Sequence, residues 1–298
     1  MSKSLSPKPT DRAPFLFPLG AAFHTDSLVL HATARHHVAQ NIAGPLSIKT
    51  VMRGEGTWRA SGREWRVKQG EFLILNAGEV YSIEIGSPSP VTTCCVFFAK
   101  GFVERMALDA TSPLAASLDD PMREGPALDF LSHWHTGPLT ARVQSLAARC
   151  NAEPRPTSFE EDFAEIAHAM LHLHAEMQSK IARVPAARAS TRKELFKRLE
   201  RGRQYLYAND ERGVSLLEAA RVAALSPYHF HRAFREVFQT TPHAYSMDRR
   251  MERAKERIYY GALVADAADV AGFANPPAFT RLFRRRYGMS PTEFRKNG

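Results

Sequence analysis

The sequence contains little cysteine and no long apolar run. Only Cys94, Cys95 and Cys150 occur among 298 residues, and no two of them have the C-x-x-C spacing. The chain therefore has neither a disulfide framework nor a cysteine zinc site, which is typical of a reducing compartment. No window approaches the roughly eighteen consecutive apolar residues of a membrane helix, and no signal peptide is recognisable. We expect a cytoplasmic protein with no membrane partner.

Signatures of catalysis are also lacking. No Ser/His/Asp or Cys/His arrangement stands out, and no Gly-rich phosphate loop is visible. The hydrophobic content of 44% supports a core in each of two domains, which excludes disordered and collagen-like classes. We expect a two-domain protein that is not an enzyme and holds no cofactor and no metal.

What the sequence has in excess is positive charge, +9 overall, and this charge lies in one part of the chain. Residues 1–187 contain 18 Lys and Arg against 19 Asp and Glu, whereas the last 111 residues contain 22 against 12. A basic domain joined to a near-neutral one indicates nucleic-acid binding in the basic part. The alternative is a basic surface that is merely solvated.

The basic part contains an internal repeat, in which residues 219–238 recur as residues 267–287. The first five matches have an offset of 48, and those after one inserted residue have an offset of 49. The later matches pair Phe230, Arg232, Phe234, Arg235, Phe238, Pro242 and Tyr245 with Phe279, Arg281, Phe283, Arg284, Tyr287, Pro291 and Phe294. Repetition at this length indicates two copies of one supersecondary unit.

Each copy has the pattern of a helix-turn-helix. An alanine-rich helix over residues 216–224 is followed by Ser226 as N-cap and Pro227 in the first helical position. In the second copy, Asn275 is the expected N-cap and Pro276 the first helical residue. The aromatic residues then follow at every fourth position, which gives the second helix one apolar face.

The helical period also predicts which side chains point outward. With the phenylalanines inward, the outward set is Tyr228, Arg232 and Arg235, flanked by His229 and His231. In the second copy it is Pro277, Arg281 and Arg284, flanked by Ala278, Thr280 and Arg285. An arginine near the start of such a helix can pair with guanine in the major groove, and those further along can contact phosphate.

The C-terminal third resembles the DNA-binding domain of the AraC/XylS family of bacterial transcription regulators. The matching segments are LSPYHFHRAFR (225–235), RMERAKERI (250–258), GFANPPAFTRLFR (272–284) and YGMSPTEFR (287–295). The resemblance implies an all-α domain in which two helix-turn-helix units, joined by a long helix over about 242–260, read successive major-groove segments of promoter DNA.

The resemblance also implies which residues contact bases. These are Tyr228, His231 and Arg232 in the first unit, and Pro277, Ala278, Thr280 and Arg281 in the second. Pro277 and Ala278 depart from the polar residues common there, so we expect Thr280 and Arg281 to read bases, with apolar contacts to thymine methyl groups.

The near-neutral part is predicted to be a small β-barrel. Strand patterns at residues 46–52, 56–60, 63–67, 70–75, 80–85 and 92–98 alternate with glycine turns. The glycines resemble those of a cupin-type barrel, which the AraC/XylS family uses to bind effectors. Tyr81 stands where a cupin metal ligand would be histidine, so a metalloenzyme is not expected. His24, His36, His37, Trp58 and Tyr81 are candidate effector-binding residues.

Between these parts, Phe163, Ile166, Met170, Leu173 and Met177 follow the spacing of a coiled-coil seam. The seam has two interpretations, pairing with a second copy or packing onto the chain's own barrel. His168 and His172 are four residues apart on the same helix, but no accompanying carboxylate completes a metal site.

The sequence thus predicts a multidomain α+β regulator with three segments. Residues 1–150 form a cupin-like β-barrel that binds a small-molecule effector, residues 151–190 form a helical dimerisation or linker segment, and residues 191–298 form the double helix-turn-helix domain. The expected partners are promoter DNA, RNA polymerase and a second copy of the chain. Two alternatives stay open, a cupin-type metalloenzyme with a DNA-binding tail and an effector-independent DNA-binding protein.

Overall fold

The computed structural model describes residues 3–5, 26–111, 125–130, 133–134, 138–152, 159–209 and 215–297. The chain divides into two compact units, Met1–Ala175 and Glu176–Gly298. His24, one of the candidate effector-binding residues, lies outside the described residues.

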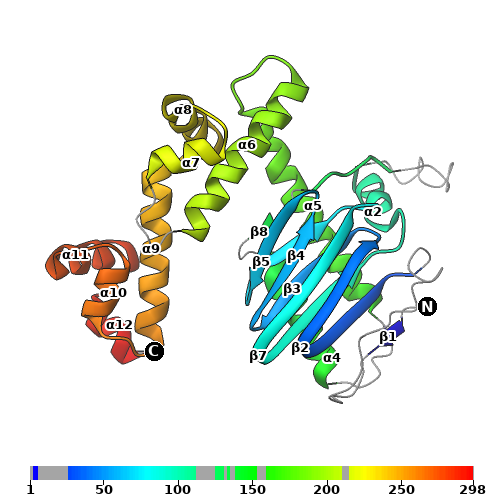
Figure 1. Cartoon of the computed structure of the whole chain (residues 1–298), viewed down its shortest axis with the longest axis horizontal. Helices are drawn as coiled ribbons and strands as arrows, with labels where there is room; N and C mark the ends of the chain where they lie inside the picture. Colours follow the sequence, from blue (N-terminus) through cyan, green and yellow to red (C-terminus); the bar gives the residue numbers. More distant parts are fainter. Residues whose placement is uncertain are drawn as a thin grey trace. The chain divides into compact units, whose positions relative to one another are not determined.

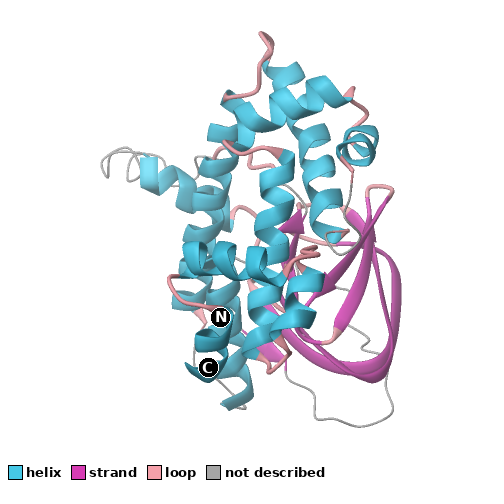
Figure 2. Ribbon diagram, turned by 90° about the vertical axis from the view of Figure 1, so that its left-hand side faces the viewer, coloured by secondary structure: helices cyan, strands magenta, loops and turns pink. Residues whose placement is uncertain are grey.

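The first unit is built on one eight-stranded sheet (Figure 1). Its strands are β1 (Lys3–Leu5), β2 (Leu28–Ala43), β3 (Ser47–Arg53), β4 (Glu55–Ala60), β5 (Arg63–Lys68), β6 (Phe72–Leu75), β7 (Val80–Phe97) and β8 (His133–Trp134). The main order is β1-β2-β7-β3-β6-β8, with β4 paired to both β5 and β7. The strands curve into a half-barrel, which agrees with the predicted fold class (Figure 2).

The longest strands differ from the sequence prediction. The predicted strands at 80–85 and 92–98 are one strand, β7, which pairs with β2 along almost its whole length. The pairing passes from Ala34↔Val91 to His36↔Gly86, so the proline-containing stretch between Gly86 and Val91 forms an irregularity within the strand. β2 was not predicted because much of it is exposed and its side chains do not alternate between apolar and polar.

The two faces of the sheet bury different cores. One face packs against helices α2 (Phe102–Thr111), α4 (Pro138–Ala152) and α5 (Glu160–Ala182) through residues such as Ile48, Val96 and Phe163. The other face carries a separate cluster that includes Trp58, Trp65, Val67, Leu73 and Tyr81. Because side chains alternate along a strand, neighbouring residues of β3 contribute to opposite cores.

The predicted coiled-coil seam packs within its own chain. Phe163, Ile166 and Met170 of α5 belong to the core between the helices and the sheet, and each is at most 1% exposed. Leu173 packs against the same core. Of the two interpretations of this seam, the structure therefore shows packing onto the chain's own barrel.

The second unit is helical beyond the end of α5. Its helices are α6 (Ala189–Ala208), α7 (Leu216–Val222), α8 (Pro227–Phe238), α9 (Pro242–Tyr259), α10 (Val264–Val270), α11 (Pro276–Tyr287) and α12 (Pro291–Asn297). α7 and α8 form the first helix-turn-helix, α10 and α11 form the second, and α9 joins them, as predicted. Helix caps fix these boundaries, since Ser226 accepts from the backbone N–H of His229 and Thr241 from that of Ala244.

The N-cap of α11 differs from the prediction. Asn275 occupies the N-cap position of α11, but its side chain makes no capping hydrogen bond. Pro276 and Pro277 remove the first two N–H groups of the helix, and the N–H of Ala278 bonds to the backbone carbonyl of Asn275 instead. The fixed φ angles of the two prolines therefore start this helix without a side-chain cap.

The two helix-turn-helix units repeat in three dimensions as well as in sequence. The ring centroids of Phe230 and Phe234 are 5.4 Å apart, and those of Phe279 and Phe283 are 5.6 Å apart. The ring centroids of Phe234 and Phe238 are 4.5 Å apart, and those of Phe283 and Tyr287 are also 4.5 Å apart. A fourth ring closes each cluster, Tyr245 at 5.9 Å from Phe234 and Phe294 at 5.8 Å from Phe283. Equivalent aromatic clusters therefore hold α8 and α11.

The turn inside each unit requires a left-handed residue. Ala224 has φ +52° in the first turn, and the equivalent Gly272 has φ +78° in the second. Alanine is strained in this region, whereas glycine is not. A Cβ on Gly272 would also lie 2.5 Å from Nη1 of Arg250.

We predict opposite effects for exchanging these two residues. Ala224→Gly should stabilise the helical unit by up to about 1 kcal/mol, because it removes the left-handed strain. Gly272→Ala should destabilise it by at least that amount, because it adds strain and crowds Arg250. Thermal unfolding of both variants tests this, and a lower midpoint for Ala224→Gly would contradict it.

Candidate nucleic-acid interface and barrel interior

The outward face of α8 carries the residues that the sequence predicted. Phe230, Phe234 and Val237 are fully buried, so the opposite side of the helix faces solvent. Tyr228 is 71% exposed, and the side chain of Arg232 is 63% exposed. His229, His231 and Arg235 are exposed as well. The structure therefore brings all five candidates of the first unit onto one face.

α11 presents the equivalent face with a different chemistry. Pro277, Arg281, Arg284 and Arg285 are exposed, and Ala278 and Thr280 are half-buried. Phe279 and Phe283 point into the core formed with α9 and α10. The start of this face is apolar and its later turns are strongly basic, whereas α8 mixes an aromatic residue, two imidazoles and two arginines.

Not every arginine of α11 belongs to this face. Arg286 pairs with Asp248 and, at 3.5 Å, with Glu252 of α9. The hydroxyl of Tyr287 donates to Glu252 at 3.1 Å. Arg286 therefore fixes α11 against the connecting helix, while Arg281 and Arg285 make no ion pair with any other described residue.

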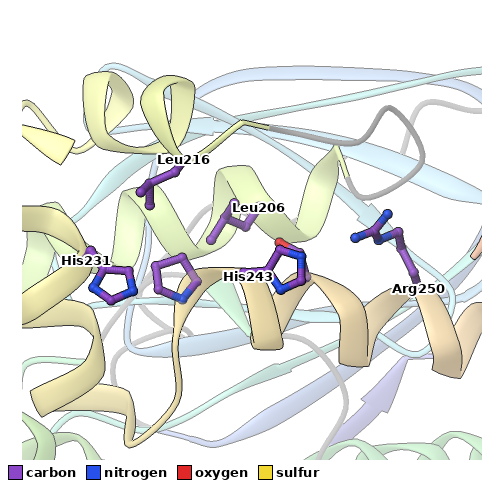
Figure 3. Close-up of a pocket in the computed structure, with 7 residues that line it drawn as sticks. Leu206, Leu216, His231, His243 and Arg250 are labelled. Atoms are coloured by element: carbon purple, nitrogen blue, oxygen red, sulfur yellow. The ribbon is translucent and has the colours of Figure 1, made fainter. Parts of the chain in front are cut away.

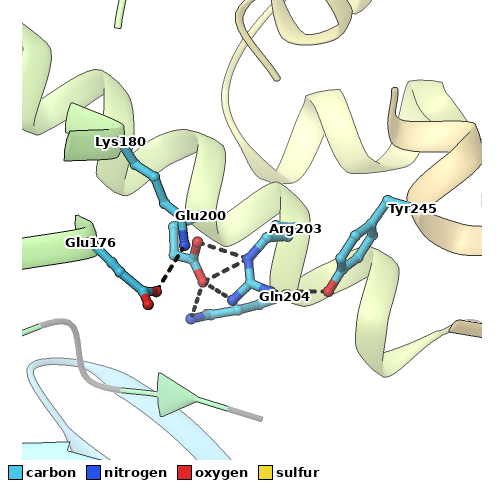
Figure 4. Close-up of polar contacts among 6 residues, drawn as sticks. All are labelled: Glu176, Lys180, Glu200, Arg203, Gln204 and Tyr245. Atoms are coloured by element: carbon cyan, nitrogen blue, oxygen red, sulfur yellow. Dashed lines mark hydrogen bonds and ion pairs between the residues drawn. The ribbon is translucent and has the colours of Figure 1, made fainter. Parts of the chain in front are cut away.

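A buried polar cluster joins the beginning of α9 to α6 (Figure 4). Arg203 of α6 donates to both carboxylate oxygens of Glu200 at 2.9 and 3.0 Å, and to the hydroxyl of Tyr245 at 3.0 Å. Burial opposes the charge of Arg203, yet Glu200 and Tyr245 raise its pKa above the ordinary value. Since Tyr245 also closes the aromatic cluster of α8, this network ties α6 to the first helix-turn-helix.

A small pocket of about 110 Å³ lies beside the first recognition helix (Figure 3). It is lined by Leu206, Leu216, His231, Pro242, His243, Ser246 and Arg250. Four helices, α6 to α9, contribute to its wall. His231 thus belongs both to this pocket and to the exposed face of α8.

α8 and α11, the second helices of the two helix-turn-helix units, differ at one charged position. Nε of Arg232 lies 3.2 Å from Oε1 of Glu236, one turn further along α8. The residue four positions after the equivalent Arg281 is Arg285, so the second unit has no such partner. The side-chain hydrogen bond to Glu236 raises the pKa of Arg232. If Arg232 contacts DNA, Glu236 would compete with the DNA acceptor for its guanidinium.

In the barrel, the structure brings together some candidate effector-binding residues and separates others. Trp58 and Tyr81 are buried in the same cluster on the face opposite the helices. His37 is half-buried, and burial lowers its pKa. It pairs across the sheet with Ile85, a member of that cluster. His36 is exposed on β2.

Lys49 is a further candidate site residue, which is absent from the candidates based on sequence. It lies in the middle of β3 at 1% exposure, between Leu73 and Cys95 of the neighbouring strands. Its ammonium donates to the hydroxyl of Tyr81 at 3.1 Å and lies 3.6 Å from the ring centroid of Phe97. Burial lowers the pKa of Lys49 to about 8. The available signal was a lysine inside the apolar run 46–52, where strand alternation places it on a core face.

The described residues were also compared with the requirements of a metal site and of a membrane span. Within these residues, no group of three or more His, Cys, Asp and Glu side chains is arranged to hold a metal ion, and His168 and His172 are both exposed on α5. No helix of the described part is long and apolar enough to cross a membrane.

The geometry defines a class of protein, a transcription regulator that joins a half-barrel to a double helix-turn-helix. Family comparison agrees: residues 24–196 match the model of the AraC-like ligand binding domain, and residues 219–297 match that of a helix-turn-helix domain. The chain belongs to the AraC family of DNA-binding transcription regulators.

Individual relatives cover most of the chain at low identity. The thermoregulatory protein LcrF of Yersinia pestis is 24% identical over 247 residues, which is 82% of this chain and 87% of LcrF. The XylDLEGF operon transcriptional activator 1 of Pseudomonas putida is 23% identical over 83% of this chain and 71% of its own length. Among solved structures, ToxT from Vibrio cholerae matches 91% of this chain and 98% of its own at 9% identity, with a TM-score of 0.34.

We predict that Glu236→Gln strengthens binding to promoter DNA. Removing the carboxylate releases Arg232 and removes one negative charge from a face that would approach phosphates, so affinity should rise severalfold at low salt. Glu256→Gln, at an exposed position of α9, is a control for loss of one negative charge outside that face. Equal effects of the two substitutions in a DNA titration would contradict the competition between Glu236 and DNA.

A second prediction concerns the pH dependence of stability. The unfolded chain keeps the Lys49 proton up to its ordinary pKa of 10.5, whereas the folded chain loses it near 8. Between these values the unfolded state binds more protons, so rising pH should stabilise the fold through Lys49 by roughly 3 kcal/mol. Cys95 and Tyr81, whose pKa values burial raises, act in the opposite direction.

The comparison with Lys49→Met isolates this contribution, because Cys95 and Tyr81 remain in both proteins. Denaturant unfolding at pH 7.5 and pH 10.5 should show the wild type gaining stability relative to the variant. Parallel pH profiles would show that Lys49 titrates normally.

Proposed function

We propose that this AraC-family regulator reads two successive major-groove segments, one with α8 and one with α11, under the control of a small molecule bound in the half-barrel. The observation that carries the proposal is the repeated helix with aromatic residues inside and arginines outside. A fork-shaped guanidinium near the start of such a helix matches the O6 and N7 acceptors of guanine.

The two helices are expected to read different chemistry. Tyr228, His231 and Arg232 offer polar groups throughout the first turns of α8, so this unit would discriminate bases mainly by hydrogen bonds. Pro277 and Ala278 have no side-chain donor, so α11 would read bases through Thr280 and Arg281 and pack its apolar start against thymine methyl groups. His229, Arg235, Arg284 and Arg285 are placed to contact phosphates.

A small molecule bound in the barrel would control DNA binding. Trp58 and Tyr81 are our candidates for effector contact, together with His36, His37 and His24. An effector changes regulation only if it binds one arrangement of the protein more tightly than another, which would shift how the two reading helices engage DNA. Saturating effector should therefore change operator affinity or footprint. The relative from Pseudomonas putida is named as an activator, so we propose that the effect is activation through RNA polymerase in the bacterial cytoplasm.

We also propose a homodimer, but not through the seam of α5. Phe163, Ile166 and Met170 are buried in the chain's own core, so a second copy would have to use another surface. Light scattering of the purified protein should give twice the chain mass of 33.3 kDa. Monomer mass at the concentration that saturates DNA would contradict this part of the proposal.

Two other functions are distinguishable by experiment. A cupin-type metalloenzyme with a DNA-binding tail would retain stoichiometric metal after purification. An effector-independent DNA-binding protein would show no ligand-induced thermal shift. We favour the regulator because the relatives that match most of the chain are named as regulators. In this proposal the protein is not an enzyme.

We predict that Arg232→Ala and Arg281→Ala each weaken specific promoter binding by about 1 to 3 kcal/mol and relax specificity at separate positions. Arg235→Ala should weaken binding to all sequences alike, because a phosphate contact carries no base preference. Fluorescence titrations on the cognate promoter and on mutated sites measure these effects.

Arg66→Ala is the matched control, an exposed arginine of the barrel that should leave DNA affinity unchanged. Retention of full specific affinity by both Arg232→Ala and Arg281→Ala would overturn the docking of α8 and α11.

A further inference from the structure

The barrel face around Lys49 has more hydrogen-bond donors than acceptors. An ammonium has three N–H donors, and that of Lys49 uses one of them on Tyr81. Tyr81 accepts this bond, and its own O–H proton has no acceptor among the described residues. No ion pair joins Lys49 to a carboxylate in the described part of the chain.

Further unsatisfied polar groups lie on the same face. The indole N–H of Trp58 and the hydroxyl of Ser47 are buried without a hydrogen-bond partner. Ser47 precedes Lys49 by two residues on β3 and pairs with Phe97, so it projects from the same face as Lys49. Trp58 belongs to the same cluster as Tyr81. Buried donors normally have partners, so several open donors on one face call for an explanation.

Lys49 also places a charge on this buried face. A buried cation is costly unless it is paired, and the described partners of Lys49 are the hydroxyl of Tyr81 and the ring faces of Tyr81 and Phe97, none of which is charged. Cys95, the residue directly across the sheet, does not supply a counter-charge because burial raises its pKa. An anion would supply the counter-charge that these neutral partners do not.

The rest of the face determines what kind of anion fits. Around the donors the cluster is apolar, with Val67, Leu73, Leu75 and Val91 fully or almost fully buried. An inorganic ion would satisfy the donors but would bring its charge into contact with these apolar side chains. A small molecule with one carboxylate and an apolar body complements both.

We propose that the effector of this regulator is an apolar monocarboxylate whose carboxylate pairs with the Lys49 ammonium and accepts from Tyr81 inside the half-barrel. This rests on the proposed function, in which the barrel binds a small molecule. Lys49, Trp58 and Tyr81 are each at most 6% exposed, so the face is closed in the structure and binding requires a side chain to move. Occupancy would thereby be coupled to the positions of these side chains.

The test measures thermal unfolding of the full-length chain at pH 7 with hexanoate, decanoate and benzoate, each against hexanol, decanol or benzyl alcohol. A ligand that binds the folded state raises the midpoint according to its concentration relative to Kd. At least one carboxylate should raise the midpoint of the wild type, and its alcohol should not. Lys49→Met should weaken binding of that carboxylate at least about tenfold.

Two further variants complete the design. Lys68→Met removes an exposed lysine of the same domain and should respond as the wild type does. Tyr81→Phe keeps the ring and removes only the hydroxyl, so it should weaken the carboxylate severalfold even if Lys49→Met folds poorly. Without any probe, Lys49→Met should unfold at an equal or higher temperature, because an apolar chain replaces a buried charge.

The inference is wrong if no carboxylate shifts the wild type, or if Lys49→Met and Tyr81→Phe bind it as tightly as the wild type. The inference is also wrong if the alcohols raise the midpoint and the two variants respond to them as the wild type does. In that case the regulator would still bind a small-molecule effector, but not through a carboxylate. Titration of wild-type protein on promoter DNA tests the regulator itself independently of all these outcomes.

Discussion

The packing of four aromatic rings, repeated in each helix-turn-helix, is the constraint on which the DNA-binding surface depends. Phe230, Phe234, Phe238 and Tyr245 in one unit, and Phe279, Phe283, Tyr287 and Phe294 in the other, fix how each second helix is rotated about its axis. Once the rings are inside, the helical period leaves Arg232 and Arg281 outside. The polar clusters of Arg203 and Arg286 then hold these helices to α6 and α9.

The half-barrel differs from the helical unit in how it holds a buried charge. Its sheet buries one face under helices and the other in an apolar cluster. That second face contains a lysine that no carboxylate of the described residues opposes. A site of this kind reduces stability, since an unpaired buried charge is unfavourable. Protein sites that hold such groups are often functional, and here the group lies in the domain whose family model is that of ligand binding.

The sequence predicted the helical unit well because its signals are local. Caps, prolines and the spacing of aromatic residues determine where α8 and α11 begin and which face is buried. Long-range features were less accessible. The length of β2 and the continuity of β7 depend on their pairing with each other, the burial of Lys49 depends on the strands beside it, and the seam of α5 has a spacing that suits either a second chain or its own sheet. The pairing of Arg232 with Glu236 is also local, because residues four apart on a helix lie next to each other.

The central claim is that α8 and α11 read two successive major-groove segments of one DNA face. Methylation-interference footprinting of the full-length chain on its promoter tests this most directly, because it reports contacts at guanine N7 in the major groove. The account predicts two blocks of interference about 10 base pairs apart, one lost in Arg232→Ala and the other in Arg281→Ala. A single block, or loss of both blocks in either variant, would contradict it.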